Sequence, residues 1–116
     1  MSDEPILDQE AVDNLRAISP DDGGEFLREL IGIFLNDTPL RIAELQQALE
    51  LGDFSTATRA VHSVKGSSSN FGALKLAALA KEIEHQCRVG SFATSSPLLA
   101  ALTSEYTRVA GALKAL

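Results

Sequence analysis

Apolar residues recur at intervals of three and four along most of this chain, and clusters of turn-forming residues interrupt the pattern. This spacing places apolar side chains on one face of an α-helix, whereas a half-buried strand alternates at intervals of two. The longest stretch runs from about Glu25 to Leu51, and its stripe includes Phe26, Leu30 and Phe34. The pattern therefore predicts amphipathic helices and no sheet.

Turn-forming residues divide the pattern into five predicted helices. The first runs from about Asp8 to Ile18, the second from about Glu25 to Leu51, the third follows Asp53, the fourth follows Gly72 and runs to about Val89, and the fifth runs from Pro97 to the C-terminus. Three of the boundaries have specific signals, because Gly52 suits a left-handed helix end, Asp53 an N-cap, and Ser96 with Pro97 an N-cap and first helical residue.

Pro39 falls inside the second segment. Since proline removes a helical hydrogen bond and crowds the preceding turn, either one helix kinks there or two helices meet. The apolar period continues through Ile42, Leu45 and Leu49, which favours one kinked helix.

Four long amphipathic segments with short connections predict an all-α fold, an antiparallel four-helix bundle with a short additional N-terminal helix over one end. Aromatic residues make up only 5% of the chain and tryptophan is absent, which favours helix packed on helix over a sandwich or barrel. A length of 116 residues suits a single domain over 1–116.

Charge and composition exclude several classes of function. A net charge of −6 with scattered Lys and Arg opposes binding to nucleic acid. The single cysteine, Cys87, has no intramolecular disulfide partner, cannot form a thiolate metal site alone, and suits a buried position. The start at Met1 is acidic, and no apolar run reaches the roughly 20 residues of a membrane span. We expect a cytoplasmic chain without direct membrane contact, either free-standing or excised from a membrane-anchored protein.

His62 lies in the third segment, about 100° round the helix from the apolar Val61. This places it at the flank of the stripe or on the outer face. A lone histidine is usually an ordinary surface residue, but its neighbours here are unusual. Lys65 and Gly66 follow at three and four residues, so both share its face.

Glycine in an exposed helix interior costs about 1 kcal/mol relative to alanine. Either Gly66 ends the helix as a C-cap, with 67–70 as a loop, or the helix continues and the missing side chain leaves room for something that approaches His62. Phe71 stays in register with the core stripe only if the helix continues, which favours the second interpretation.

The histidine segment resembles the signature of histidine-containing phosphotransfer (HPt) domains. The run that carries the resemblance is His62-x-x-Lys65-Gly66-Ser67-Ser68, closed by Gly72. Other matching stretches are Ile6-Leu7-Asp8, Phe26-Leu27-x-x-Leu30, Leu51-Gly52-Asp53-Phe54 and Gly72-Ala73-x-x-Leu76. The resemblance covers nearly the whole chain.

The resemblance implies that His62 is reversibly phosphorylated, Lys65 stabilises the phosphoryl group, and Gly66 leaves room for the partner. It also implies that Glu84 accepts a hydrogen bond from Nδ1 of the histidine, as in the chemotaxis-kinase branch, and that Lys81 is a second cation near the phosphate. The spacing alone leaves another interpretation open, a solvated salt-bridged face of Lys81, Glu84 and Arg88. His85 lacks such a motif and is expected to be a surface histidine.

The implied partners are receiver domains of response regulators and hybrid histidine kinases. The magnesium ion belongs to the receiver, so no cofactor or metal is expected here, and the chain should be a monomer without autokinase activity. Two alternatives remain. One is a docking bundle in which His62 is never phosphorylated; the other is the dimerising bundle of a histidine kinase, which places an acidic residue where Ser63 stands.

Overall fold

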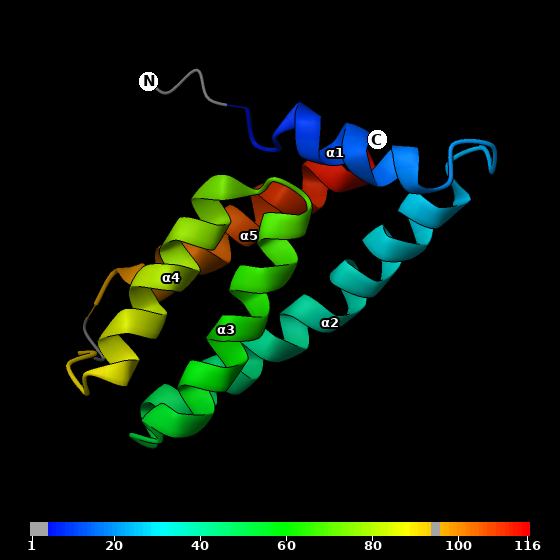
Figure 1. Cartoon of the computed structure of the whole chain (residues 1–116). Helices are drawn as coiled ribbons and strands as arrows, with labels where there is room; N and C mark the ends of the chain where they lie inside the picture. The colour runs from blue at the N-terminus through cyan, green and yellow to red at the C-terminus, as the bar shows by residue number, and fades with distance from the viewer. Residues whose placement is uncertain (1–4, 94–95) are drawn as a thin grey trace.

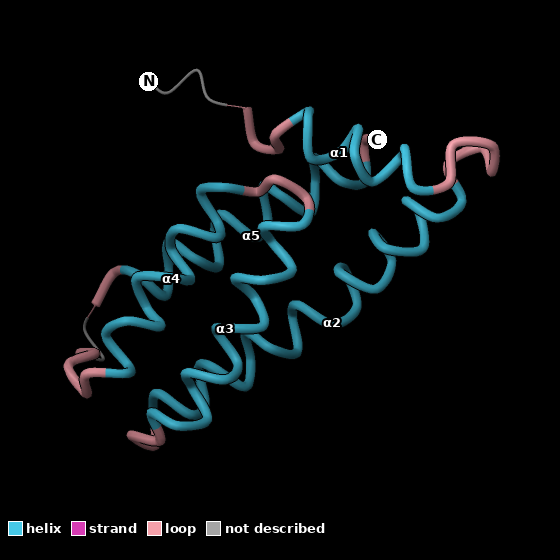
Figure 2. Tube along the Cα trace, in the orientation of Figure 1, coloured by secondary structure: helices cyan, strands magenta, loops and turns pink. Residues whose placement is uncertain are grey.

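The computed structural model describes residues 5–93 and 96–116, and the acidic start over 1–4 lies outside this range. Five helices follow one another within it: α1 (Gln9–Ile18), α2 (Glu25–Glu50), α3 (Phe54–Asn70), α4 (Leu74–Arg88) and α5 (Leu98–Lys114). Short loops join them, and the described part of the chain contains no strand (Figure 2). The predicted all-α class is therefore confirmed.

The four long helices pack side by side in a helical bundle. α3 packs between α2 and α4, while α5 packs against α4 and also contacts α2. Successive long helices reverse direction, and α1 crosses one end of the bundle close to the C-terminus (Figure 1). This arrangement leaves one long face of α3 and the adjoining face of α4 open to solvent.

The core combines one stripe from each long helix. The side chains of Leu45, Val61, Leu76, Ile83 and Leu102 are completely buried within it. Aromatic contacts join α2 to the two neighbouring segments: the Phe34 ring meets Phe71 edge to face at a centroid distance of 5.3 Å, and Tyr106 of α5 at 5.8 Å. The core therefore fixes how α3 is rotated and which of its residues face outward.

Cys87 is buried in α4, as the sequence predicts, and this burial raises the pKa of its thiol. It belongs to the packed core. Its sulfur is therefore shielded from the reactions of an exposed thiolate.

Pro39 lies inside a single uninterrupted helix, so the alternative of two helices meeting there is wrong. The residues before and after it belong to one buried stripe, which includes Phe34, Thr38 and Ile42. Burial of that stripe on both sides offsets the hydrogen bond that proline removes.

The helix ends follow the predicted signals closely. Gly52 has a φ of +70° after α2, and the Asp53 carboxylate accepts a hydrogen bond from the Thr56 amide at 3.1 Å. The start of α5 differs by one residue, because Pro97 is the cap and Leu98 the first helical residue. The Ser96 hydroxyl still accepts from the Leu98 amide at 3.2 Å, which explains the sequence signal.

Gly72 joins α1 to the turn between α3 and α4. Its φ is +67°, and its carbonyl accepts a hydrogen bond from the Asp8 amide at 2.8 Å. A β-carbon at this position would lie 2.9 Å from the Asp8 amide nitrogen and 2.9 Å from the Ala11 β-carbon. Only glycine combines this backbone conformation with so close an approach.

We expect Gly72→Ala to lower the free energy of unfolding by about 2–4 kcal/mol, because the methyl group displaces α1 and the left-handed backbone is strained. Gly90→Ala is the matched control, since Gly90 has a φ of +68° but open space around its β-carbon position. It should cost only about 1 kcal/mol. Urea unfolding measures both losses, and equal losses would contradict the proposed contact with α1.

Candidate functional site

His62 projects from the open face of α3. Its side chain is 59% exposed, whereas its neighbours Val61 and Val64 are completely buried. The rotation of α3 in the core therefore turns His62 outward, as the apolar period predicts. The Asp53 cap and the core contacts fix the helix that carries it.

The buried carboxylate of Glu84 reaches across from α4 to the base of the histidine. Its side chain is only 5% exposed, and its Oε2 atom lies 2.7 Å from Nδ1 of His62. The Lys65 ammonium donates to Oε1 at 2.6 Å, and the Arg88 guanidinium donates to Oε2 at 2.9 Å. One carboxylate thus gathers three partners from two helices.

The charge of Glu84 is set by two opposing effects. Burial raises its pKa, but hydrogen bonds from Lys65, Arg88 and His62 outweigh that effect and lower the pKa to about 2. The carboxylate is therefore ionised at neutral pH and acts only as a hydrogen-bond acceptor.

The ionised carboxylate determines the tautomer of the neutral His62 ring. Since Glu84 has no proton to give, Nδ1 must carry the hydrogen that bridges the 2.7 Å contact. The lone pair of the neutral ring then lies on Nε2. The geometry presents an oriented imidazole with a free nitrogen on an open surface.

Gly66 lies in the interior of α3, one turn beyond His62, so the C-cap interpretation is wrong. The helix continues to Asn70, and within it the hydroxyls of Ser68 and Ser69 donate to the carbonyls of Val64 and Lys65, at 2.6 and 2.9 Å. Gly66 is exposed, and a β-carbon there would have nothing within 4 Å. Packing inside this chain therefore does not require glycine at this position.

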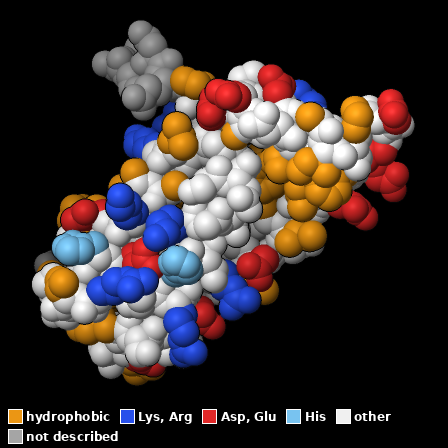
Figure 3. Space-filling model, viewed as in Figure 1, with side chains coloured by type: hydrophobic (Ala, Val, Ile, Leu, Met, Phe, Trp, Pro, Cys, Tyr) orange, Lys and Arg blue, Asp and Glu red, His pale blue; other side chains and the backbone are white. Residues whose placement is uncertain are grey.

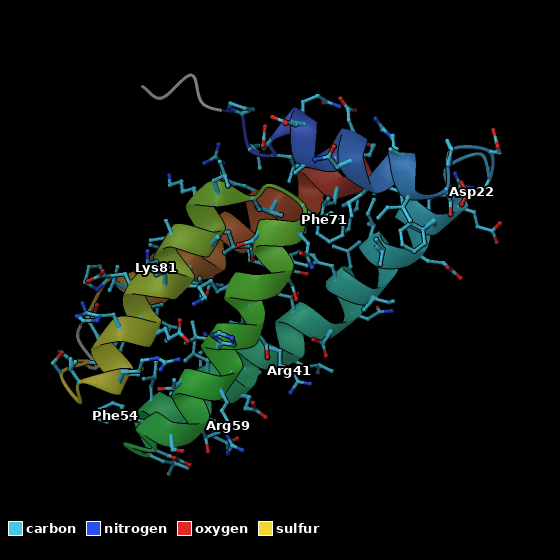
Figure 4. The ribbon with its side chains drawn as sticks, viewed as in Figure 1. Asp22, Arg41, Phe54, Arg59, Phe71 and Lys81 are labelled. Carbon is cyan, nitrogen blue, oxygen red and sulfur yellow. The ribbon has the colours of Figure 1, made fainter. Side chains whose placement is uncertain are left out.

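The structure does not bring Lys81 into the same cluster. Lys81 is exposed on α4 (Figure 4), and it makes no hydrogen bond or ion pair with any described residue. The predicted salt-bridged face of α4 included Lys81, Glu84 and Arg88. Of the two basic residues on that face, Arg88 pairs with Glu84 and Lys81 does not. His85 is exposed, as expected.

Arg88 is the member of the site that the sequence prediction left without a role. Its spacing of four residues from Glu84 is the signal that indicated a shared face. What the spacing could not show is that Arg88 binds the same carboxylate oxygen as His62. Basic side chains gather around the pale-blue histidines on this face (Figure 3).

Two negative findings apply to residues 5–93 and 96–116. No three His, Cys, Asp or Glu side chains converge there as ligands for a metal ion. No helix in that range is long and apolar enough to span a membrane.

We expect Glu84 to stabilise the fold in a pH-dependent way. Its folded pKa of about 2 lies below the ordinary 4.5, so its contribution is complete above about pH 4.5 and is lost as the pH falls toward 2. Glu84→Gln should lower the free energy of unfolding by about 2 kcal/mol at pH 7, after allowance for exposed partners. Urea unfolding between pH 7 and 2.5 should show the free energies of unfolding of wild type and Glu84→Gln converging as the pH falls. A difference that stays constant with pH would contradict an ionised carboxylate at Glu84.

The fold and the site place this chain among small helical domains that carry an exposed histidine oriented by a carboxylate. The family model described as Hpt domain matches residues 29–112, and the chain belongs to this family.

Named relatives agree with this assignment. Multistep phosphorelay regulator 1 of Schizosaccharomyces pombe is 28% identical over 85 residues, which cover 73% of this chain and 29% of that protein. Histidine-containing phosphotransfer protein 4 of Arabidopsis thaliana is 31% identical over 87 residues, covering 73% of this chain and 68% of the relative. The chain thus spans less than a third of the first relative and about two thirds of the second.

A solved structure has the same fold. The crystal structure of histidine-containing phosphotransfer protein B (HptB) from Pseudomonas aeruginosa PAO1 matches with a TM-score of 0.85 and 32% identity. The match covers 95% of this chain and 92% of that one. The similarity therefore extends to α1, which lies before the start of the family model at residue 29.

Proposed function

We propose that this chain is a phosphotransfer intermediate of a two-component phosphorelay. His62 accepts a phosphoryl group from a receiver-domain aspartate, or from a partner kinase, and passes it to the aspartate of another receiver. The observation that carries the proposal is the contact between Nδ1 and the ionised Glu84, which leaves Nε2 as the nucleophile on an open surface.

The proposed step is an in-line displacement at phosphorus. Nε2 of His62 forms the new P–N bond while the P–O bond of the aspartyl phosphate breaks, and the aspartate leaves as a carboxylate. The phosphorylated ring stays bonded to Glu84 through Nδ1–H. Lys65 compensates the added negative charge, and Gly66 leaves the approach to Nε2 clear. The exposed Lys81 on α4 is the second cation in this proposal.

The scaffold in this proposal is an antiparallel four-helix bundle with α1 over one end, acting as a single monomeric domain over 1–116. The chain has no Gly-rich nucleotide loop, so we propose that it does not phosphorylate itself. Magnesium would be held by the receiver, whose aspartate forms the other half of the reaction.

The receiver would meet a mixed surface around His62. The net charge of −6 opposes an acidic receiver pocket, but screening limits that repulsion to about 8 Å at physiological salt. Nearby cations such as Arg59 therefore determine how strongly the receiver is attracted to this surface.

Beyond Gly66, Asn70 lines a pocket of about 130 Å³ between α1, α2 and α3, with the 63%-exposed Ile33 among its apolar residues. Asn70 lies about 12 Å along the helix from His62. A footprint of about 800 Å² reaches that far.

Incubation with a panel of phosphorylated receiver domains tests the proposal. The chain should take up acid-labile, base-stable phosphate from at least one receiver, and peptide mapping should place it on His62. Uptake from none of a broad panel would favour the non-phosphorylated docking bundle. Uptake from ATP alone would instead contradict the absence of autokinase activity.

A further inference from the structure

Arg88 contacts the site but has no role in the phosphoryl-transfer step proposed above. Its guanidinium donates to Oε2 of Glu84, the oxygen that also accepts from His62, while Lys65 occupies Oε1. The Arg88 side chain is itself 61% exposed. The site therefore holds two cations on one carboxylate.

Lys65 has two negative partners once His62 is phosphorylated. It is already bonded to Glu84, and it lies three residues from His62 on the same face of α3. A phosphoryl group on Nε2 adds nearly two negative charges close to its flexible ammonium group. If Lys65 turns toward the phosphoryl group, the buried Glu84 loses the partner on Oε1.

Arg88 can remain when Lys65 turns away. It lies four residues after Glu84 on α4, so its contact does not depend on the position of α3. Its guanidinium is charged at every accessible pH and binds the oxygen next to Nδ1. It can therefore keep the carboxylate in place while Lys65 serves the phosphoryl group.

We propose that Arg88 is a positioning residue, which holds Glu84 on Nδ1 of His62 so that Lys65 is free to move to the phosphoryl group. This inference rests on the proposed function. Its alternative is an ordinary exposed ion pair with little effect on the histidine.

The chain contains a matched control for that alternative. Arg108 on α5 is 52% exposed and donates to the buried Glu105 at 2.9 Å, three residues away on the same helix. Neither residue contacts a histidine in the described structure. Arg108→Ala thus removes a similar exposed arginine from a similar buried glutamate without touching the site.

The first test imitates the departure of Lys65 and needs no phosphoryl donor. Nitrogen-15 NMR of the ring should show the Nδ1–H tautomer of His62 in Lys65→Ala and in Lys65→Ala/Arg108→Ala. The ratio of Nδ1–H to Nε2–H tautomer should fall by about tenfold in Lys65→Ala/Arg88→Ala, and Lys65→Ala/Arg88→Lys should restore much of it. An unchanged tautomer ratio in the Arg88→Ala double variant would overturn the inference.

The second test uses phosphoramidate, a small donor that needs no docking surface. Arg88→Ala should take up phosphate at His62 about tenfold more slowly than wild type and Arg108→Ala. Equal rates in all three proteins would overturn the role of Arg88. If wild type accepts phosphate from neither phosphoramidate nor any receiver, the proposed function fails instead, while the tautomer ratio still decides whether Arg88 positions Glu84.

Discussion

His62→Ala is expected to abolish phosphoryl uptake from a phosphorylated receiver, a fall of more than about a hundredfold, because no other side chain at the site offers a free imidazole nitrogen. The fold should survive. His62 is 59% exposed, and Glu84 keeps Lys65 and Arg88 when the ring is removed. The free energy of unfolding should therefore change by less than about 1 kcal/mol. Phosphate transfer is measured by autoradiography, and helicity by circular dichroism.

The second histidine supplies the control for this experiment. His85 is also exposed, but it lies on α4 without a carboxylate partner in the described structure. His85→Ala should transfer phosphate at the wild-type rate. Uptake that persists in His62→Ala and disappears in His85→Ala would move the phosphorylated position to α4.

The outward position of His62 could be predicted from the sequence because helical rotation is a local property. Once Val61 and Val64 face the core, the rotation of His62 follows from the helix alone. The same reasoning predicts the Asp53 cap and the Gly52 helix end, since each depends on a few neighbouring residues. Local rules therefore recovered most of the helix boundaries.

The partners of Glu84 depend on how α3 and α4 pack together, which spacing along one helix does not determine. Spacing alone placed Lys81 and Arg88 equally well beside Glu84, but only Arg88 bonds to it. The link to His62 was expected only from a family resemblance. The structure places the two side chains 2.7 Å apart across 22 residues of sequence.

Gly72 is a second case in which local sequence patterns did not predict a contact between distant residues. The sequence marks it as the end of the histidine segment, and the structure gives it a φ of +67°. Its contact with Asp8 joins residues that are distant in the chain. No periodicity in the sequence indicates that contact.

Replacement of Gly66 is expected to separate the stability of the domain from its phosphotransfer. Gly66→Ala should raise the free energy of unfolding by about 1 kcal/mol, because the position is helical and exposed and a β-carbon there meets nothing within 4 Å. Gly66→Gln and Gly66→Glu should also fold. Both place a long side chain one turn from His62 on the face that a receiver must reach.

The two long variants should lose transfer from a phosphorylated receiver by about a hundredfold, since a displacement of about 1 Å from the in-line geometry has effects of that size. Gly66→Gln should still accept phosphate from phosphoramidate, because a small donor can reach Nε2 past the new side chain. Comparison with Gly66→Glu separates the effect of size from that of charge. Normal transfer from the receiver to both long variants would show that the glycine leaves no space that the partner needs.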